Sequence, residues 1–226
     1  MANKKMAVLL VEGQGDVDFF EALLRQLQLL DKIDITPPKN YGLKANTVSH
    51  FPKLINLLIK RLQKGEIQQL GIIADADYVS GGGFQQRWKT LTTQLAQNGY
   101  RIPSNPPKLP YTGSLFQHAD GLAPIGLWLM PDHKNNGMLE DLIKQTVSGD
   151  EQHQLLKTAN TCLKKLPVTL FSDYHQTKAT VYTWLAWQKR PGQTLDVTIN
   201  GNLINLQSTE MQGFINWLHK VFKNTQ

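Results

Sequence analysis

Short apolar runs alternate along the chain with segments in which apolar residues recur every three or four positions. The runs at residues 6–11, 71–74 and 125–130 are bounded by polar or small residues, which is typical of strands buried on both faces of a parallel sheet. Residues 33–36 form a shorter strand candidate, followed by two prolines and a polar loop to Asn46. The other segments predict amphipathic helices, so the pattern favours an α/β fold with a mainly parallel sheet flanked by helices.

The expected helices divide the chain into two parts. We expect an α/β core over residues 1–148 and a mainly helical C-terminal extension, packed on that core, over residues 149–226. Five prolines between residues 102 and 124 predict loop or an edge hairpin there, and Asn200-Gly201 predicts a small hairpin over residues 194–206. The helices are expected at residues 16–30, 51–64, 84–98, 138–146, 151–166, 177–188 and 211–223, with Asp16 capping the first.

Acidic residues follow two of the expected strands. Glu12 comes directly after the first apolar run, and Asp75 and Asp77 come at the end of the second. In an open α/β sheet the ends of neighbouring parallel strands meet at one edge, where ligands bind. Carboxylates that converge there repel one another unless a cation neutralises them, and hard oxygen ligands suit Mg²⁺ or Mn²⁺. The leading interpretation is a divalent-metal site, and the alternative is a pair of solvated strand ends.

The segments Val-Glu-Gly-Gln-Gly-Asp at residues 11–16 and Ile-Ala-Asp-Ala-Asp at residues 73–77 resemble the motifs of the Toprim domain, the metal-binding fold of topoisomerases, bacterial primases and OLD-family nucleases. The resemblance implies a Toprim-like fold. It also implies that Glu12 acts as a general acid or base or as a metal ligand, and that Asp75 and Asp77 form the metal-binding aspartate pair. Segments 127–142 and 183–192 resemble a small stand-alone Toprim-like family of unassigned function.

Further candidate residues follow the third strand and precede a late helix. Leu139-Glu140-Asp141-Leu142 is similar, with spacing that differs by one residue, to an OLD-family element whose acid serves the metal site, which implies Glu140 as a ligand. The alternative is a pair of acids that favour a helix N-terminus. Lys178 precedes a Leu-Ala helix, and the OLD resemblance implies a cation over the scissile phosphate; the alternative is a solvated lysine. Asp132 is an additional candidate ligand, and His133 is expected at the surface.

The composition indicates the class of binding partner and the cellular compartment. The net charge of +6 and the sequence pI near 9.3 favour a polyanion such as DNA or RNA, although dispersed lysines also serve solubility. A single cysteine, Cys162, excludes an internal disulfide and favours a reducing, cytoplasmic compartment. No apolar stretch approaches the ~20 residues that cross a bilayer, so no membrane association is expected. Glu12 ends the first apolar run without a small-residue cleavage site, so no signal peptide is expected.

Other chemistries find little support in the sequence. Gly81, Gly82 and Gly83 are not followed by the Lys-Ser or Lys-Thr of a phosphate-binding loop, and we expect a flexible loop over the site instead. Trp184 and Trp187 are expected to pack in a helix rather than to stack on bases. Cys162 lacks the partners of a zinc site, and no serine-hydrolase elbow occurs.

The sequence thus predicts a Mg²⁺-dependent phosphoryl-transfer protein, in the first place a nucleic-acid phosphodiesterase of Toprim type. Glu12, Asp75 and Asp77 would hold the metal, with a second metal near Glu140. The alternative is a non-catalytic module that binds a metal, nucleotide or phosphate as a subunit of a larger complex. A partner protein and a homo-oligomer both remain open at this stage.

Overall fold

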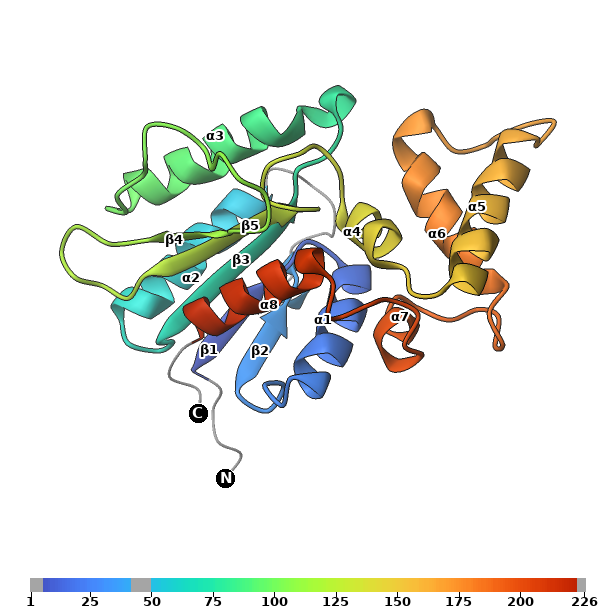
Figure 1. Ribbon diagram of the computed structural model, residues 1–226. Helices are drawn as coiled ribbons and strands as arrows, with labels where there is room; N and C mark the ends of the chain where they lie inside the picture. The colour runs from blue at the N-terminus through green and yellow to red at the C-terminus, as the bar shows by residue number, and fades with distance from the viewer. Residues whose placement is uncertain (1–5, 42–49, 223–226) are drawn as a thin grey trace.

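A computed structural model describes residues 6–41 and 50–222 and contains a five-stranded sheet in the order β2-β1-β3-β5-β4 (Figure 1). The strands β1 (Ala7–Leu10), β2 (Ile33–Thr36), β3 (Gln69–Asp75) and β5 (Ile125–Met130) run parallel. The edge strand β4 (Ser114–Phe116) runs antiparallel to β5, within the proline-rich segment. The predicted α/β fold with a mainly parallel sheet is confirmed.

Helices cover both faces of this sheet, as the uninterrupted apolar runs require. One core lies under α2 (His50–Gln63) and α3 (Gly83–Gln97), and the other lies under α1 (Gln14–Gln26), α4 (Leu139–Thr146) and α8 (Thr209–Val221). Successive strand residues enter different cores: Leu9 belongs to the second and Leu10 to the first. Every residue of β1 and β5 is buried for this reason.

Helix α8 packs directly on the face of β3 and β5. Two strand glycines make room for it, because a Cβ at Gly71 would press on Phe222 and one at Gly126 would collide with Val221. Trp217 on the same helix is almost fully buried, and its Nε1 donates a hydrogen bond to the Ser114 carbonyl oxygen at 3.1 Å. The close approach of α8 therefore depends on small residues in two neighbouring strands.

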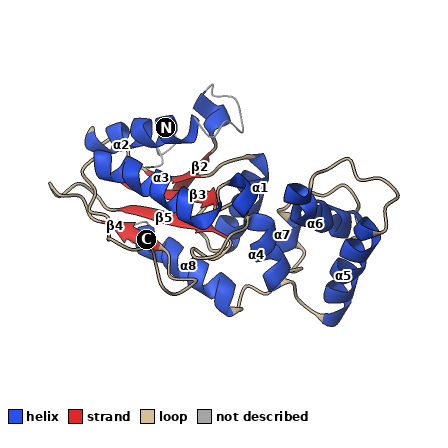
Figure 2. Cartoon of the chain, turned by 90° about the horizontal axis from the view of Figure 1, so that it is seen from above, coloured by secondary structure: helices blue, strands red, loops and turns tan. Residues whose placement is uncertain are grey.

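The remaining helices gather at one end of the sheet (Figure 2). Helices α5 (Asp150–Lys164) and α6 (Gln176–Ala186) pair with each other, and the 3₁₀ turn η3 (Asp173–His175) leads into α6. Helix α6 also contacts α4. The division at residue 148 stays a prediction. Among the helices that the structure describes, none combines the length and hydropathy that a bilayer-spanning segment needs.

Two local expectations fail or fall outside the described chain. The hairpin predicted over residues 194–206 is wrong, because the segment contains the short helix α7 (Val197–Asn200). Leu195 and Ile199 are both buried at helical spacing, and Asn200 Nδ2 donates to Asp196 Oδ2 at 3.1 Å across one helical turn. The polar loop expected up to Asn46 lies outside the described residues beyond Tyr41.

Candidate functional site

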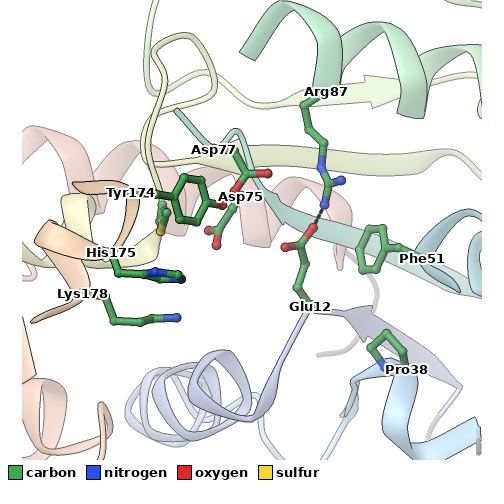
Figure 3. A pocket seen from close by; sticks show the side chains of 10 residues that line it. Glu12, Pro38, Phe51, Asp75, Asp77, Arg87, Tyr174, His175 and Lys178 are labelled. Atoms are coloured by element: carbon green, nitrogen blue, oxygen red, sulfur yellow. Dashed lines mark hydrogen bonds and ion pairs between the residues drawn. The ribbon is translucent and has the colours of Figure 1, made fainter. Parts of the chain in front are cut away.

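The carboxyl ends of β1 and β3 open onto a cavity of about 260 Å³. Its lining includes the carboxylates of Glu12, Asp75 and Asp77. It also includes the nitrogen-bearing side chains of Arg87, His175 and Lys178 (Figure 3). In Figure 3, Arg87 and Lys178 approach from opposite sides with the carboxylates between them. The three acids predicted from the sequence therefore line one cavity, whereas their sharing of one metal ion stays a prediction.

Asp75 ends β3 against the N-terminus of α4. The Leu139 amide of that helix donates a hydrogen bond to Asp75 Oδ1 at 3.1 Å. Burial raises the pKa of Asp75 well above its ordinary value, and repulsion from Asp16 and Glu140 raises it further. Asp75 is thus a partly buried carboxyl group beside other acids.

Asp16, which the sequence predicts only as a helix cap, also lies among these acids. The helix begins earlier than predicted, with Gly13 as its N-cap, and Asp16 lies in the first turn, where its Oδ2 accepts hydrogen bonds from the amides of Glu12 at 3.1 Å and Gly13 at 2.9 Å. Burial raises the pKa of Asp16 to about 6, although the Gly13 hydrogen bond lowers it, and the charge of Glu140 adds to the rise. We call Asp16, Asp75 and Glu140 the acid cluster.

Lys178 faces the acid cluster from α6. Its Nζ lies 3.5 Å from Glu140 Oε1, and Glu140 is only 4% exposed. Burial lowers the pKa of Lys178, but attraction from Glu140 and Asp75 outweighs that effect, so its pKa lies above the ordinary value. Lys178 is therefore held as a cation beside buried carboxylates.

Asp77 reaches the cavity from the turn that follows β3. The strand ends at Asp75, and Asp77 adopts a left-handed backbone conformation (φ 62°) that forms an isolated bridge with Gly137. Asp75 and Asp77 are therefore not alternate residues of one continuous strand. Tyr174 donates its hydroxyl hydrogen to Asp77 Oδ1. Burial raises the pKa of Asp77, and the Tyr174 hydrogen bond partly offsets the rise.

Glu12 forms an ion pair with Arg87, a residue for which the sequence offered no signal. Arg87 projects from α3, and its Nη2 contacts Glu12 Oε1. The guanidinium carbon also lies 5.7 Å from the centre of the Phe51 ring. Burial lowers the pKa of Arg87 below its ordinary value. A single arginine on an amphipathic helix carries no motif, so only the packing of α3 reveals its place in the cavity.

A set of hydroxyl contacts holds α6 beside α4. The hydroxyls of Tyr78 and Thr177 lie 2.7 Å apart, and both contact the carboxylate of Asp141, at 2.6 Å and 3.2 Å. Asp141 also accepts a hydrogen bond from the Met138 amide at 3.0 Å. Because Thr177 immediately precedes Lys178, these bonds hold the backbone from which Lys178 projects.

Asp132 and His133 serve the turn after β5. Asp132 is 2% exposed, and its Oδ1 accepts hydrogen bonds from the amides of Lys134 at 3.0 Å and Asn135 at 2.7 Å. The expectation of a surface His133 is wrong, since this side chain is fully buried. Its Nδ1 accepts from the Leu129 amide at 2.9 Å, and burial lowers its pKa to about 3. His133 is therefore neutral and structural.

The glycines at residues 81–83 do not form the flexible loop expected over the site. Gly81 ends the 3₁₀ turn η2 (Val79–Gly81), and Gly83 begins α3. Gly82 needs its freedom from a side chain, because its φ is 108°. Of the two tryptophans expected to pack in a helix, Trp184 is fully buried and Trp187 is 41% exposed.

The carboxylate oxygens of the site are ligands of the kind that a divalent cation prefers, although several of them are paired with other side chains of the protein. Among residues 6–41 and 50–222, no three side chains of His, Cys, Asp or Glu are arranged to hold a metal ion. Arg87 engages Glu12, Tyr174 engages Asp77, and Lys178 engages Glu140. Asp16 and Asp75 still combine partial burial with mutual repulsion, which a bound cation would relieve.

We expect the wild-type protein to become less stable as the pH rises through the range in which Asp16 titrates, and we expect Asp16→Asn to abolish this loss. Because the pKa of Asp16 rises from 3.8 to about 6 on folding, the folded state binds more protons than the unfolded state between these values. The contribution of Asp16 to the free energy of unfolding therefore falls through this window, by an amount on the order of 3 kcal/mol. Urea unfolding in EDTA across the window measures it, with exposed Asp31→Asn as control. Parallel profiles for wild type and Asp16→Asn would contradict the prediction.

Comparison with known protein families gives a match over nearly the whole described chain. A family described as "Protein of unknown function (DUF3226)" matches residues 6–223. The comparisons with curated proteins and with solved structures give no match.

Proposed function

We propose that this chain, which belongs to the DUF3226 family, is a Mg²⁺- or Mn²⁺-dependent phosphodiesterase that acts on DNA or RNA. The observation that carries the proposal is the acid cluster at the sheet edge, with Lys178 facing it from α6. Carboxyl groups with a raised pKa, such as those of Asp16 and Asp75, are typical of functional sites when a cation lies beside them. The resemblance of the two acidic motifs to Toprim and OLD-family proteins supports the same proposal.

Asp16, Asp75 and Glu140 are the first candidates to hold the metal, because Glu140 is buried, Asp16 and Asp75 are partly buried, and the three interact electrostatically. Asp77 and Glu12 would join them on release from Tyr174 and Arg87. Asp132 stays a less favoured ligand, since its carboxylate caps the turn after β5. A bound divalent cation supplies a polarised water and neutralises charge on a phosphate group.

The protein's own side chains would position the substrate and move a proton. Lys178 would stabilise the negative charge that develops on the scissile phosphate, because its amino group is fixed beside the acid cluster. Glu12 would accept or donate the proton at its carboxylate oxygen once it leaves Arg87. The basic net charge of +6 would draw a nucleic acid to the protein.

The second candidate function is a non-catalytic module that binds a nucleotide or phosphorylated ligand within a larger complex. The observation that favours it is the pairing of Glu12 with Arg87, because that pairing leaves the proposed base engaged. A partner protein or a second copy of the chain would then supply the activity. For either function we propose the cytoplasm as the compartment, because Cys162 has no cysteine with which to pair.

We expect purified protein with Mn²⁺ to cleave labelled DNA or RNA, and Glu12→Gln to reduce the rate by about 10²-fold or more, since it removes the proton acceptor. Single- and double-stranded substrates should be tested in parallel, with circular dichroism to verify folding. Glu21→Gln, an exposed position on α1, is the matched control and should keep full activity. Cleavage that persists in Glu12→Gln indicates a contaminating nuclease. Ligand binding without cleavage of any substrate favours the second function.

A further inference from the structure

Arg87 presents unused hydrogen-bond donors inside the cavity. Its side chain is only 11% exposed, and a guanidinium carries five N–H groups. The ion pair with Glu12 involves Nη2, while the buried Nε has no hydrogen-bond partner among the described residues. Buried donors without partners are rare in native proteins and each is costly. The guanidinium is therefore incompletely satisfied by the protein and faces the space where a ligand would lie.

The surroundings of Arg87 combine this cation with apolar surface. Phe51 lies against the guanidinium, and Pro38 lines the same part of the cavity (Figure 3). A charged fork beside an aromatic ring and a proline suits a phosphate that carries a sugar or a base. The cavity of about 260 Å³ lies just below the range of about 300–1,000 Å³ for small-molecule sites. It therefore suits one nucleotide unit rather than a duplex.

We propose that Arg87, with Phe51 and Pro38, forms a subsite for the phosphate of one nucleotide, and that Glu12 occupies this subsite when no phosphate is bound. Carboxylate and phosphate both present paired oxygens that match the guanidinium fork, so one can replace the other. The inference rests on the proposed function for the identity of the substrate as nucleic acid. It adds that substrate binding at Arg87 releases Glu12.

Because Glu12 and a bound phosphate would compete for Arg87, substitutions of Arg87 and of Glu12 should change the phosphate affinity in opposite directions. Arg87→Gln removes the cation and should weaken binding. Glu12→Gln removes the competing charge and should strengthen it, because the guanidinium is then free for the ligand. A merely structural ion pair would lead both variants to lose affinity together. The direction of the Glu12→Gln change is therefore diagnostic.

The test is isothermal titration calorimetry in EDTA at low salt, with thymidine 5′-monophosphate and inorganic phosphate as probes. We expect Arg87→Gln to weaken nucleotide binding by at least about 10-fold and Arg87→Lys to lose part of that affinity, because it keeps the charge without the fork. Glu12→Gln should tighten binding by about 5-fold. The nucleotide should bind about 10-fold more tightly than phosphate if Phe51 contacts its base or sugar. Lys89→Gln, an exposed position on the same helix, is the control and should bind like wild type.

Several outcomes would overturn the subsite. Equal affinities of wild type and Arg87→Gln, weaker binding by Glu12→Gln, or no binding of either probe by wild type would each do so. If Arg87→Gln fails to fold, Arg87→Lys and Glu12→Gln still decide the matter. Because EDTA removes divalent ions, the titration is independent of catalysis. Nucleotide binding without metal-dependent cleavage supports the subsite and contradicts the phosphodiesterase. Cleavage together with nucleotide binding that Arg87→Gln leaves unchanged supports the phosphodiesterase and contradicts the subsite.

Discussion

Asp75→Asn is expected to abolish Mn²⁺ binding and at the same time to raise the free energy of unfolding of the metal-free protein at neutral pH. Asp75 is partly buried, and Asp16 and Glu140 repel its charge, so the ionised carboxylate opposes folding unless a cation is bound. Asparagine keeps the shape and can still accept the Leu139 hydrogen bond. We expect a stabilisation in EDTA on the order of 1 kcal/mol, the usual scale of a single substitution.

Two measurements on the same samples test this prediction. Calorimetric titration with Mn²⁺ reports the binding, and urea unfolding in EDTA reports the stability. Asp31→Asn, which changes an exposed carboxylate, should leave both unchanged. Unaltered Mn²⁺ affinity in Asp75→Asn would remove Asp75 from the proposed site, while lower stability in EDTA would show that its carboxylate is needed for folding.

Lys178→Met should slow cleavage by about 10²–10³-fold without weakening Mn²⁺ binding. Lys178 contacts Glu140, so it competes with a divalent ion for that carboxylate. Its removal should leave the metal affinity unchanged or higher, and only the charge stabilisation on the phosphate should be lost. Single-turnover cleavage at saturating Mn²⁺ separates the two effects.

The same substitution has a thermodynamic signature in the metal-free protein. Without Lys178, Glu140 remains buried beside other acids, so the free energy of unfolding in EDTA should fall by about 1 kcal/mol, a modest value because half of the lysine side chain is exposed. Added Mn²⁺ should restore it. Lys157→Met, at an exposed position of α5, is the control. A decrease in Mn²⁺ affinity would indicate that Lys178 orders the acid cluster instead.

The strands were predictable because a strand buried on both faces is a short continuous run of apolar residues, and such a run is recognisable in the sequence. Residues 125–130 and 33–36 are strands with the expected bounds, and residues 71–74 lie within β3. The segment 194–206 misled because alternation over a few residues is compatible with a short helix. There, the Asn200–Asp196 hydrogen bond and the burial of Leu195 and Ile199 determine the conformation.

The candidate site was predictable where chain direction alone brings residues together. Glu12 follows β1 and Asp75 ends β3, and because these strands are adjacent and parallel, the sheet places both residues at one edge. Asp16 had a readable signal, since the first turn of a helix after a strand returns to that edge. Arg87 and Tyr174 had none, because each depends on how a distant helix or turn packs against the sheet. His133 was misplaced because its burial follows from its partners, the Leu129 amide and Ser114.

The packing of α8 across β3 and β5 has a consequence for biosynthesis. Until the ribosome has added residues 209–221, the apolar face opposite Gly71 and Gly126 lacks the helix that covers it in the folded protein. A nascent chain that already contains all five strands would expose that face, which favours association with chaperones or aggregation. The sheet is therefore expected to reach its native packing only late in translation or after it, even though the acids at its edge are synthesised much earlier.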